Sequence, residues 1–285
     1  MKQKKIINIL IPLALGLIIA IALYKIISIQ REYQKAQDEY RELEAYVVKE
    51  PIGDPMPEVG SGQIQDTSDA AVPPGEHDSG AEPDSTESNG GVILHIDEDG
   101  LRAINEDYRA WLRIPSLSIS YPLVWGRDND YYLHYTFEGK YNAAGCLFID
   151  CETASDFSHR NTFIYGHNMK NGSMFGSLKR FRNEQGLCAS DPYFYIYQDD
   201  MIYEYEIFAY YTTEYTSDSY RLIDTEEEYD AYIADVKRLT EYVPERDMDF
   251  SGQPNIVTLS TCAGSGGTTK RMVVHGVLVN ISERQ

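Results

Sequence analysis

Hydrophobic and polar positions divide the chain into contrasting segments, beginning with a long apolar run. Residues 6–24 carry no charged side chain, and residues 26–29 extend the run beyond Lys25. Because a helix needs about 20 apolar residues to cross a bilayer, the pattern predicts a transmembrane helix over residues 6–29. The basic tail 1–5 places the N-terminus in the cytoplasm by the positive-inside rule. A cleaved signal peptide is the alternative, but its apolar region is usually shorter.

Two polar segments follow the apolar run. Residues 30–50 are charged and helix-favouring, which predicts a solvated juxtamembrane helix that continues the membrane helix. Residues 51–90 contain nine acids, six prolines and six glycines, and no Lys, Arg or aromatic residue. Such a segment cannot bury enough apolar surface to offset its chain entropy. We therefore predict a disordered acidic linker over 51–91, which would let the following domain move above the membrane.

Residues 92–285 have the composition of a globular domain that is mainly β. Apolar and β-branched runs predict strands at 111–114, 117–124, 145–150, 162–165, 191–198, 201–213, 256–261 and 271–279. Helical spacing of apolar residues predicts helices at 97–109 and 225–241, with shorter helical segments at 131–135 and 173–181. The domain is thus expected to begin with a helix and to carry a long helix before its last two strands.

The last two predicted strands carry the most specific chemistry. The first ends on Cys262, a Gly-rich loop follows over 263–270, and Arg271 opens the second strand. A thiol at a strand end, with a guanidinium entering the next strand, suggests a nucleophile beside an anion-stabilising group. A buried structural cysteine and a surface arginine are the alternative, since free cysteine is among the most buried residue types.

The net charge and the cysteine spacing bear on which partners and which metal sites the chain can have. The net charge of −20 argues against nucleic acid as a partner. The four cysteines form no CxxC pair and show no zinc spacing. Cys146 and Cys151 could form a disulfide, although we favour packing roles for these two and for Cys188.

Three stretches resemble one enzyme family. The sequence TLSTC at 258–262, followed by Arg271-Met272-Val273-Val274, resembles the signature of the sortases, and its spelling is similar to class B. The stretch NTFIYGHNMKNGSMFGSLKRF at 161–181 resembles the class B segment that holds the catalytic histidine, and WLRIPSLSISYPLVWGRDNDYYL at 111–133 resembles the start of class B domains. The resemblance covers about residues 96–282. It implies a closed β-barrel of about eight strands, with an N-terminal helix and a long helix before the cysteine strand.

The resemblance also implies roles for individual residues. Cys262 would be the nucleophile, His167 the general acid/base, and Arg271 the group that stabilises the oxyanion or the substrate. His275 is the rival acid/base, because strand alternation puts it on the same face as Arg271. No cofactor and no metal are implied. The expected substrate-binding residues are Asn129, Leu133, Tyr165, Ser260 and Thr261.

A member of this class would be a membrane-anchored cysteine transpeptidase. It would cleave a C-terminal sorting signal of the Asn-Pro-x-Thr type after Thr, hold the protein as a thioester on Cys262, and transfer it to an amine of the peptidoglycan precursor. Its partners would be secreted proteins bearing that signal, the precursor amine and the membrane, with a single span, a cytoplasmic N-terminus and an extracellular catalytic domain. The alternatives are a pilin-polymerising sortase that uses a pilin lysine, and a non-catalytic surface adhesion module.

Overall fold

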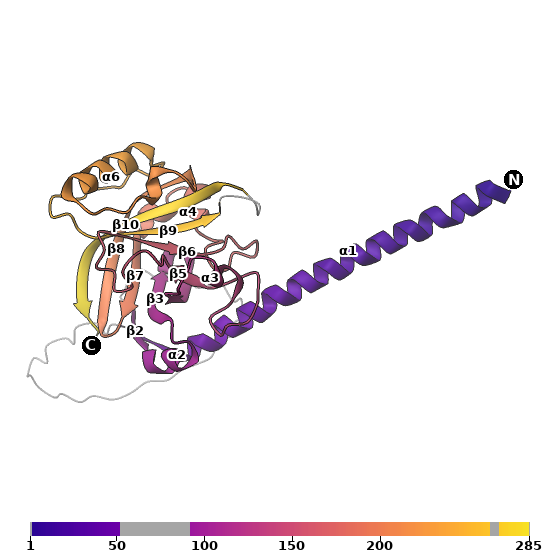
Figure 1. Ribbon diagram of the computed structural model, residues 1–285, viewed down its shortest axis with the longest axis horizontal. Coiled ribbons are helices and arrows are strands. Elements are labelled where there is room, and N and C mark those ends of the chain that lie inside the picture. Colours follow the sequence, from indigo (N-terminus) through magenta and orange to yellow (C-terminus); the bar gives the residue numbers. More distant parts are fainter. Residues whose placement is uncertain (1, 52–91, 263–267, 285) are drawn as a thin grey trace, which may run out of the picture.

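The computed structural model describes residues 2–51, 92–262 and 268–284, with the backbone alone for residues 2–14, 50, 51, 92, 93 and 262. Most of the predicted acidic linker and most of the Gly-rich loop therefore lie outside the described residues. A barrel with helices around it forms the folded body, and one long helix projects from it (Figure 1).

Eight strands of the described chain close into a barrel in the order β10-β8-β7-β3-β4-β5-β6-β9. Neighbouring strands are antiparallel except for two parallel pairs, β4–β5 and β6–β9. This arrangement confirms the prediction of a closed, mainly β barrel. The strands are β3 (Tyr108–Ile114), β4 (Ile119–Val124), β5 (Leu147–Ile149), β6 (Asn161–Tyr165), β7 (Tyr193–Gln198), β8 (Met201–Glu214), β9 (Ile256–Cys262) and β10 (Lys270–Glu283).

Helix α6 (Glu226–Leu239) is the long helix expected before the cysteine strand, and it lies beside the barrel (Figure 1). Its start is fixed by a capping box, in which the Thr225 hydroxyl accepts from the Glu228 backbone N–H and the Glu228 side chain reaches back. One stripe of the helix is buried against the outer faces of β8, β9 and β10. Each large side chain buried in this way contributes about 1.5–3 kcal/mol. The stripe consists of Tyr229, Tyr232, Ile233 and Val236.

The remaining helices of the barrel domain are short. They are α2 (Glu98–Ile104), α3 (Tyr131–His134), α4 (Arg180–Asn183) and α5 (Leu187–Ser190). The predicted helix 97–109 ends early, because Asn105 takes an extended conformation and its side chain accepts from the Asp107 backbone N–H. Tyr108 thus belongs to β3 and not to a helical face. The predicted helix 173–181 is also displaced: its residues form successive turns, and α4 begins only at its end.

Helix α1 (Lys2–Leu43) enters the predicted juxtamembrane segment without a break and ends against the barrel (Figure 1). The predicted helix over 30–50 is too long, because residues 44–46 form a 3-10 turn and residues 47–51 form a strand. Ala36, Tyr40 and Leu43 are buried there, at 3%, 7% and 1% exposure. The prediction of a solvated helix is therefore wrong from Ala36 onward. Apolar residues at i, i+4 and i+7 of this otherwise charged segment explain the packing, since they share one face of the helix.

The two described residues that flank the acidic segment are paired with each other. After α1, strand β1 (Val47–Pro51) pairs antiparallel with β2 (Val92–Ile96), with Pro51 opposite Val92. Residues 52–91 thus begin and end at the same edge of this two-stranded sheet. Residues 52–91 lie outside the described residues, and α1 contacts the barrel directly.

No helix in the described part of the chain combines the length and the apolar character that a membrane span requires. The expected span over 6–29 is not supported by this finding. The side chains of residues 6–14, which belong to that span, lie outside the described set.

Candidate active site

The three expected catalytic residues, called the catalytic row below, lie at the same end of three adjacent strands: Cys262 on β9, Arg271 on β10 and His167 two residues after the end of β6. Strands β9 and β10 pair Cys262 with Arg271, so these two positions are directly opposite each other. Strands β6 and β9 run parallel with Tyr165 opposite Ser260, and the Gly166 N–H donates to the Ser260 carbonyl at 3.1 Å. His167 lies two residues beyond Tyr165, and Cys262 lies two residues beyond Ser260, so both follow the last pair of this parallel ladder. Residues far apart in the sequence thus meet at one edge of the barrel.

Cys262 is the last residue of β9, at the point where the chain enters the Gly-rich loop. The other three cysteines are free thiols with unfavourable environments for a nucleophile. Burial raises the pKa of the Cys146 and Cys188 thiols to about 12. Partial burial and the neighbouring Asp150 carboxylate raise the pKa of Cys151. Because the thiolate is the reactive form, none of these three is prepared for nucleophilic attack.

The imidazole of His167 is held by one backbone hydrogen bond. Its Nε2 lies 2.7 Å from the carbonyl oxygen of Leu133 in α3. A carbonyl only accepts, so Nε2 carries the proton and donates. In the neutral ring, Nδ1 is then the nitrogen with a free lone pair, able to accept a proton from a reacting group. The preceding residue, Gly166, packs closely on β5, because a Cβ there would lie 2.3 Å from the Leu147 side chain.

The guanidinium of Arg271 lies near the start of β10. Its Nη1 donates to the carbonyl oxygens of Thr268 and Lys270, at 2.8 and 3.1 Å. Its Cζ is 5.6 Å from the centre of the Tyr215 ring, within cation–π range. These contacts use one nitrogen of the group. An arginine head carries five N–H donors, so donors remain for an oxyanion or a peptide carbonyl.

His275 lies on the same strand as Arg271 but has a different environment. It is fully buried, and its Nδ1 lies 2.9 Å from the Thr258 hydroxyl while its Nε2 lies 3.1 Å from the Tyr211 hydroxyl. Burial lowers the pKa of His275 to about 3. A neutral histidine enclosed by hydroxyl groups under α6 has no access to a substrate.

Three of the expected substrate-binding residues border this row. Leu133 contributes the carbonyl that holds His167. The Asn129 amide donates to one oxygen of the Asp150 carboxylate at 3.1 Å, and the Tyr165 hydroxyl donates to the other at 2.7 Å. Asp150 was not anticipated from the sequence. Its position after a three-residue strand carries no pattern that distinguishes it from other acids in this acidic chain.

The other two expected substrate-binding residues are buried. Ser260 is 2% exposed, and its hydroxyl lies 2.7 Å from that of Tyr220. Thr261 is 4% exposed and is opposite Met272, a residue of the main core. The structure therefore places neither side chain at the surface. Tyr220 also stacks on Tyr165, with ring centres 6.5 Å apart. No periodic pattern around residue 220 predicts that Tyr220 contacts these two residues.

Among the residues that the structure describes, no group of three or more His, Cys, Asp or Glu side chains is placed to bind a metal ion. The chemistry that the described residues can perform is proton transfer at His167 and hydrogen bonding to an anion at Arg271, on either side of the Cys262 position.

Comparison with known proteins identifies the family. The sortase domain matches residues 112–279. Sortase B of Listeria monocytogenes is 39% identical over 185 residues, which are 63% of this chain and 72% of that protein. The structure of Clostridium perfringens sortase B aligns with a TM-score of 0.59 at 29% identity, covering 65% of this chain and all of that one.

A Staphylococcus aureus sortase B–substrate complex aligns with a TM-score of 0.58 at 25% identity, over 64% of this chain and 84% of that one. The His167 segment, the Cys262 strand and most of the barrel lie inside the matched region. The chain therefore belongs to the sortase family and is a cysteine transpeptidase of class B.

Proposed function

We propose that this protein cleaves a C-terminal sorting signal of the Asn-Pro-x-Thr type after its Thr and transfers the upstream protein to an amine of the peptidoglycan precursor. The observation that carries the proposal is the catalytic row: Cys262 of β9 is opposite Arg271 of β10, and His167 follows the end of the neighbouring strand β6. It combines a thiol, a proton carrier and a directed hydrogen-bond donor, the three groups that acyl transfer through a thioester requires.

The first half of the reaction forms the thioester. The Cys262 thiolate attacks the carbonyl carbon of the scissile Thr, and Arg271 donates hydrogen bonds to the oxygen as it gains negative charge. Protonated His167 gives its proton to the leaving amine as the C–N bond breaks. The hydrogen bond from Nε2 to Leu133 leaves Nδ1 as the nitrogen that transfers this proton.

The second half uses the same groups in reverse. The incoming amine attacks the thioester carbonyl, and neutral His167 takes a proton from its nitrogen. The C–S bond breaks, a new amide forms, and the Cys262 thiolate is restored. No oxidant, metal or nucleotide enters the balance of either half.

The N-terminal segment supports a location at the cell membrane. Nineteen residues without charge, 6–24, follow three lysines in the first five residues. We propose that this run anchors the protein by a single span with its N-terminus in the cytoplasm. The catalytic domain would then lie outside the cell, where secreted proteins with a sorting signal and the wall precursor are both found.

Peptide cleavage with defined acceptors tests this proposal. The full-length protein, reconstituted in lipid vesicles, is incubated with Asn-Pro-x-Thr peptides and with other sorting peptides. Each incubation contains a wall-precursor stem peptide, a pilin-derived lysine peptide or no amine, and products are identified by mass. We expect cleavage after Thr and a new amide to the stem peptide. Transfer to the pilin lysine alone would instead indicate a pilus-assembly enzyme, and cleavage that survives Cys262→Ala would refute the mechanism.

A further inference from the structure

The helix that precedes the barrel is connected to the catalytic histidine by two routes. We propose that Tyr40 of α1 is a positioning residue for His167, acting through the two segments that hold the imidazole and its backbone. The inference deepens the proposed function and rests on it for the identity of His167 as the acid/base.

Tyr40 lies at the centre of the contact between α1 and the barrel. Its side chain is 7% exposed, and its hydroxyl donates to the Gly145 carbonyl at 2.6 Å. Its ring packs edge-on against Tyr121 of β4, with ring centres 5.3 Å apart and planes at 88°. One side chain thus contacts two segments that are otherwise separate in the barrel.

The first route runs through Gly145 to the imidazole. Gly145 has a positive φ of 57°, and a Cβ there would lie 2.4 Å from the Tyr132 carbonyl oxygen and 3.0 Å from that of Leu133. The next residue, Cys146, donates its N–H to the Tyr132 carbonyl at 2.9 Å. The segment under the Tyr40 hydroxyl therefore packs directly on the backbone of α3, where the Leu133 carbonyl holds Nε2 of His167.

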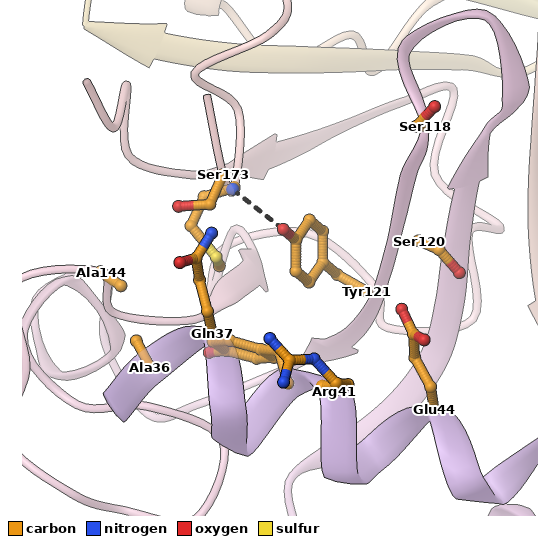
Figure 2. Close-up of a pocket in the computed structure, with 11 residues that line it drawn as sticks. Ala36, Gln37, Arg41, Glu44, Ser118, Ser120, Tyr121, Ala144 and Ser173 are labelled. Atoms are coloured by element: carbon orange, nitrogen blue, oxygen red, sulfur yellow. Dashed lines mark hydrogen bonds between the residues drawn. The ribbon is translucent and has the colours of Figure 1, made fainter. Parts of the chain in front are cut away.

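The second route runs through Tyr121 to the backbone of His167. The Tyr121 hydroxyl accepts from the Met174 N–H at 3.3 Å, and the Phe175 N–H donates to the His167 carbonyl at 3.0 Å. Figure 2 shows α1 running below Tyr121, whose hydroxyl meets the chain beside Ser173. The loop 167–175 thus folds back on its own histidine and is fixed by the ring on which Tyr40 packs.

Further contacts hold α1 in this position. The Asn142 amide donates to the Glu32 carbonyl at 3.0 Å, and the Glu138 N–H donates to the Glu39 carboxylate at 3.1 Å. Glu39 is 5% exposed, so this contact is shielded from water. Between α1, β4 and the loop remains a polar cavity of about 280 Å³ (Figure 2). Tyr40 and Tyr121 both line this cavity, so the Tyr40 contacts join α1 to the barrel at the edge of an unfilled space.

The test compares Tyr40→Phe with a control in the same helix. Tyr40→Phe removes the hydroxyl and keeps the ring, so the variant is expected to fold. Leu43→Ala is the control, because Leu43 is 1% exposed and has no polar group. We expect Tyr40→Phe to lower kcat for peptide cleavage roughly tenfold with KM unchanged, since small displacements of a catalytic group cost up to 10²-fold. Leu43→Ala should lower the unfolding temperature and leave kcat within about twofold.

A second readout does not depend on turnover. The ¹⁵N resonances of the His167 ring report which nitrogen carries the proton, and the wild-type protein should show protonated Nε2. In Tyr40→Phe the two tautomers should become mixed. An unchanged His167 spectrum together with an unchanged kcat would overturn the positioning role. Failure of the wild-type protein to cleave any sorting peptide would count against the proposed function instead, and the ring spectrum would still decide the role of Tyr40.

Discussion

At the scale of single residues, burial separates the two candidate histidines. His275 shares a strand with Arg271, and alternation alone made it a credible acid/base. The structure encloses it completely between Thr258, Tyr211 and α6, and burial lowers its pKa to about 3. His167 is half-buried, and one of its nitrogens is held by a single carbonyl. Sequence spacing could not make this distinction, because it does not show which strand face a helix covers.

Burial of neutral His275 predicts acid lability. The pKa of histidine in the unfolded chain is about 6.5, so between that pH and about 3 the unfolded state binds a proton that the folded state does not. The free energy of unfolding therefore falls as pH decreases through this window, by up to about 1.4 kcal/mol per pH unit. We expect His275→Gln to remove the contribution of His275 to this fall. The free energy of unfolding, measured with urea from pH 7 to 4.5, should then depend less steeply on pH in the variant than in the wild type.

The prediction concerns the slope of the unfolding free energy of His275→Gln against pH, and not its stability at pH 7. Acidic groups titrate in both proteins, so their contributions cancel in the difference between the two slopes. Equal slopes for the variant and the wild type would show that folding does not lower the pKa of His275, which would contradict the prediction.

Arg271 is expected to act through directed hydrogen bonds. One nitrogen of its head is already bonded to two carbonyls, which orients the planar group beside the Cys262 position. Lysine offers a compact charge without this fork, and loss of one oxyanion donor costs about 10²–10³ in rate. We predict that Arg271→Lys and Arg271→Ala both lower kcat/KM for peptide cleavage by about 10²-fold or more. If Arg271 only favoured the thiolate by its charge, Arg271→Lys would retain nearly full activity.

At the scale of elements, local patterns predicted more than long-range pairing. The capping box at Thr225 and the apolar spacing of α6 are encoded within a few residues, and the sequence predicted that helix to within two residues at its C-terminal end. The pairing of β1 with β2 spans the acidic segment, and five residues after a charged helix carry no signal for it. The Tyr220–Ser260 contact was missed for the same reason, since its partners are 40 residues apart.

The place of His167 in the catalytic row was predicted only through the family motifs. Spacing brought Cys262 and Arg271 together, because both belong to one hairpin. His167 joins them by the parallel pairing of β6 with β9, which no local pattern reveals. Its bond to Leu133 and the link from Asn129 to Tyr165 through Asp150 depend on the same long-range geometry.

The antiparallel pairing of β1 and β2 makes the acidic segment replaceable. Pro51 and Val92 are opposite each other, so residues 52–91 can be exchanged for a short Asn-Gly turn without moving either strand. We expect this deletion to keep the rate of peptide cleavage and to stabilise the protein by roughly 2 kcal/mol, because a shorter loop loses less entropy on closure. Urea unfolding and cleavage assays would check both values.

If the deletion variant folds but cleaves the peptide slowly, the acidic segment contributes to substrate binding or catalysis. A variant that unfolds more easily would contradict the pairing of the two strands. As a control, the same turn can replace residues 52–91 in a chain that also carries Cys262→Ala. That protein should gain the same stability and have no activity.

At the scale of the whole molecule, α1 and the barrel form one body. The helix leaves the barrel as a straight rod, and its buried end contacts the segments that support His167 (Figure 1). The sequence suggested a catalytic domain on a long flexible tether. The structure instead predicts that the direction of α1 fixes the orientation of the active site, so that any surface holding the N-terminus also orients the row of His167, Cys262 and Arg271.

Mass spectrometry of the enzyme during turnover tests the central claim most directly. The full-length protein is mixed with an Asn-Pro-x-Thr peptide in the absence of an amine, quenched in acid and digested. The account predicts one adduct, the peptide acyl group ending in Thr, attached to Cys262 and removed by an added amine. An adduct on Cys146, Cys151 or Cys188, or cleavage by Cys262→Ala without any adduct, would contradict it.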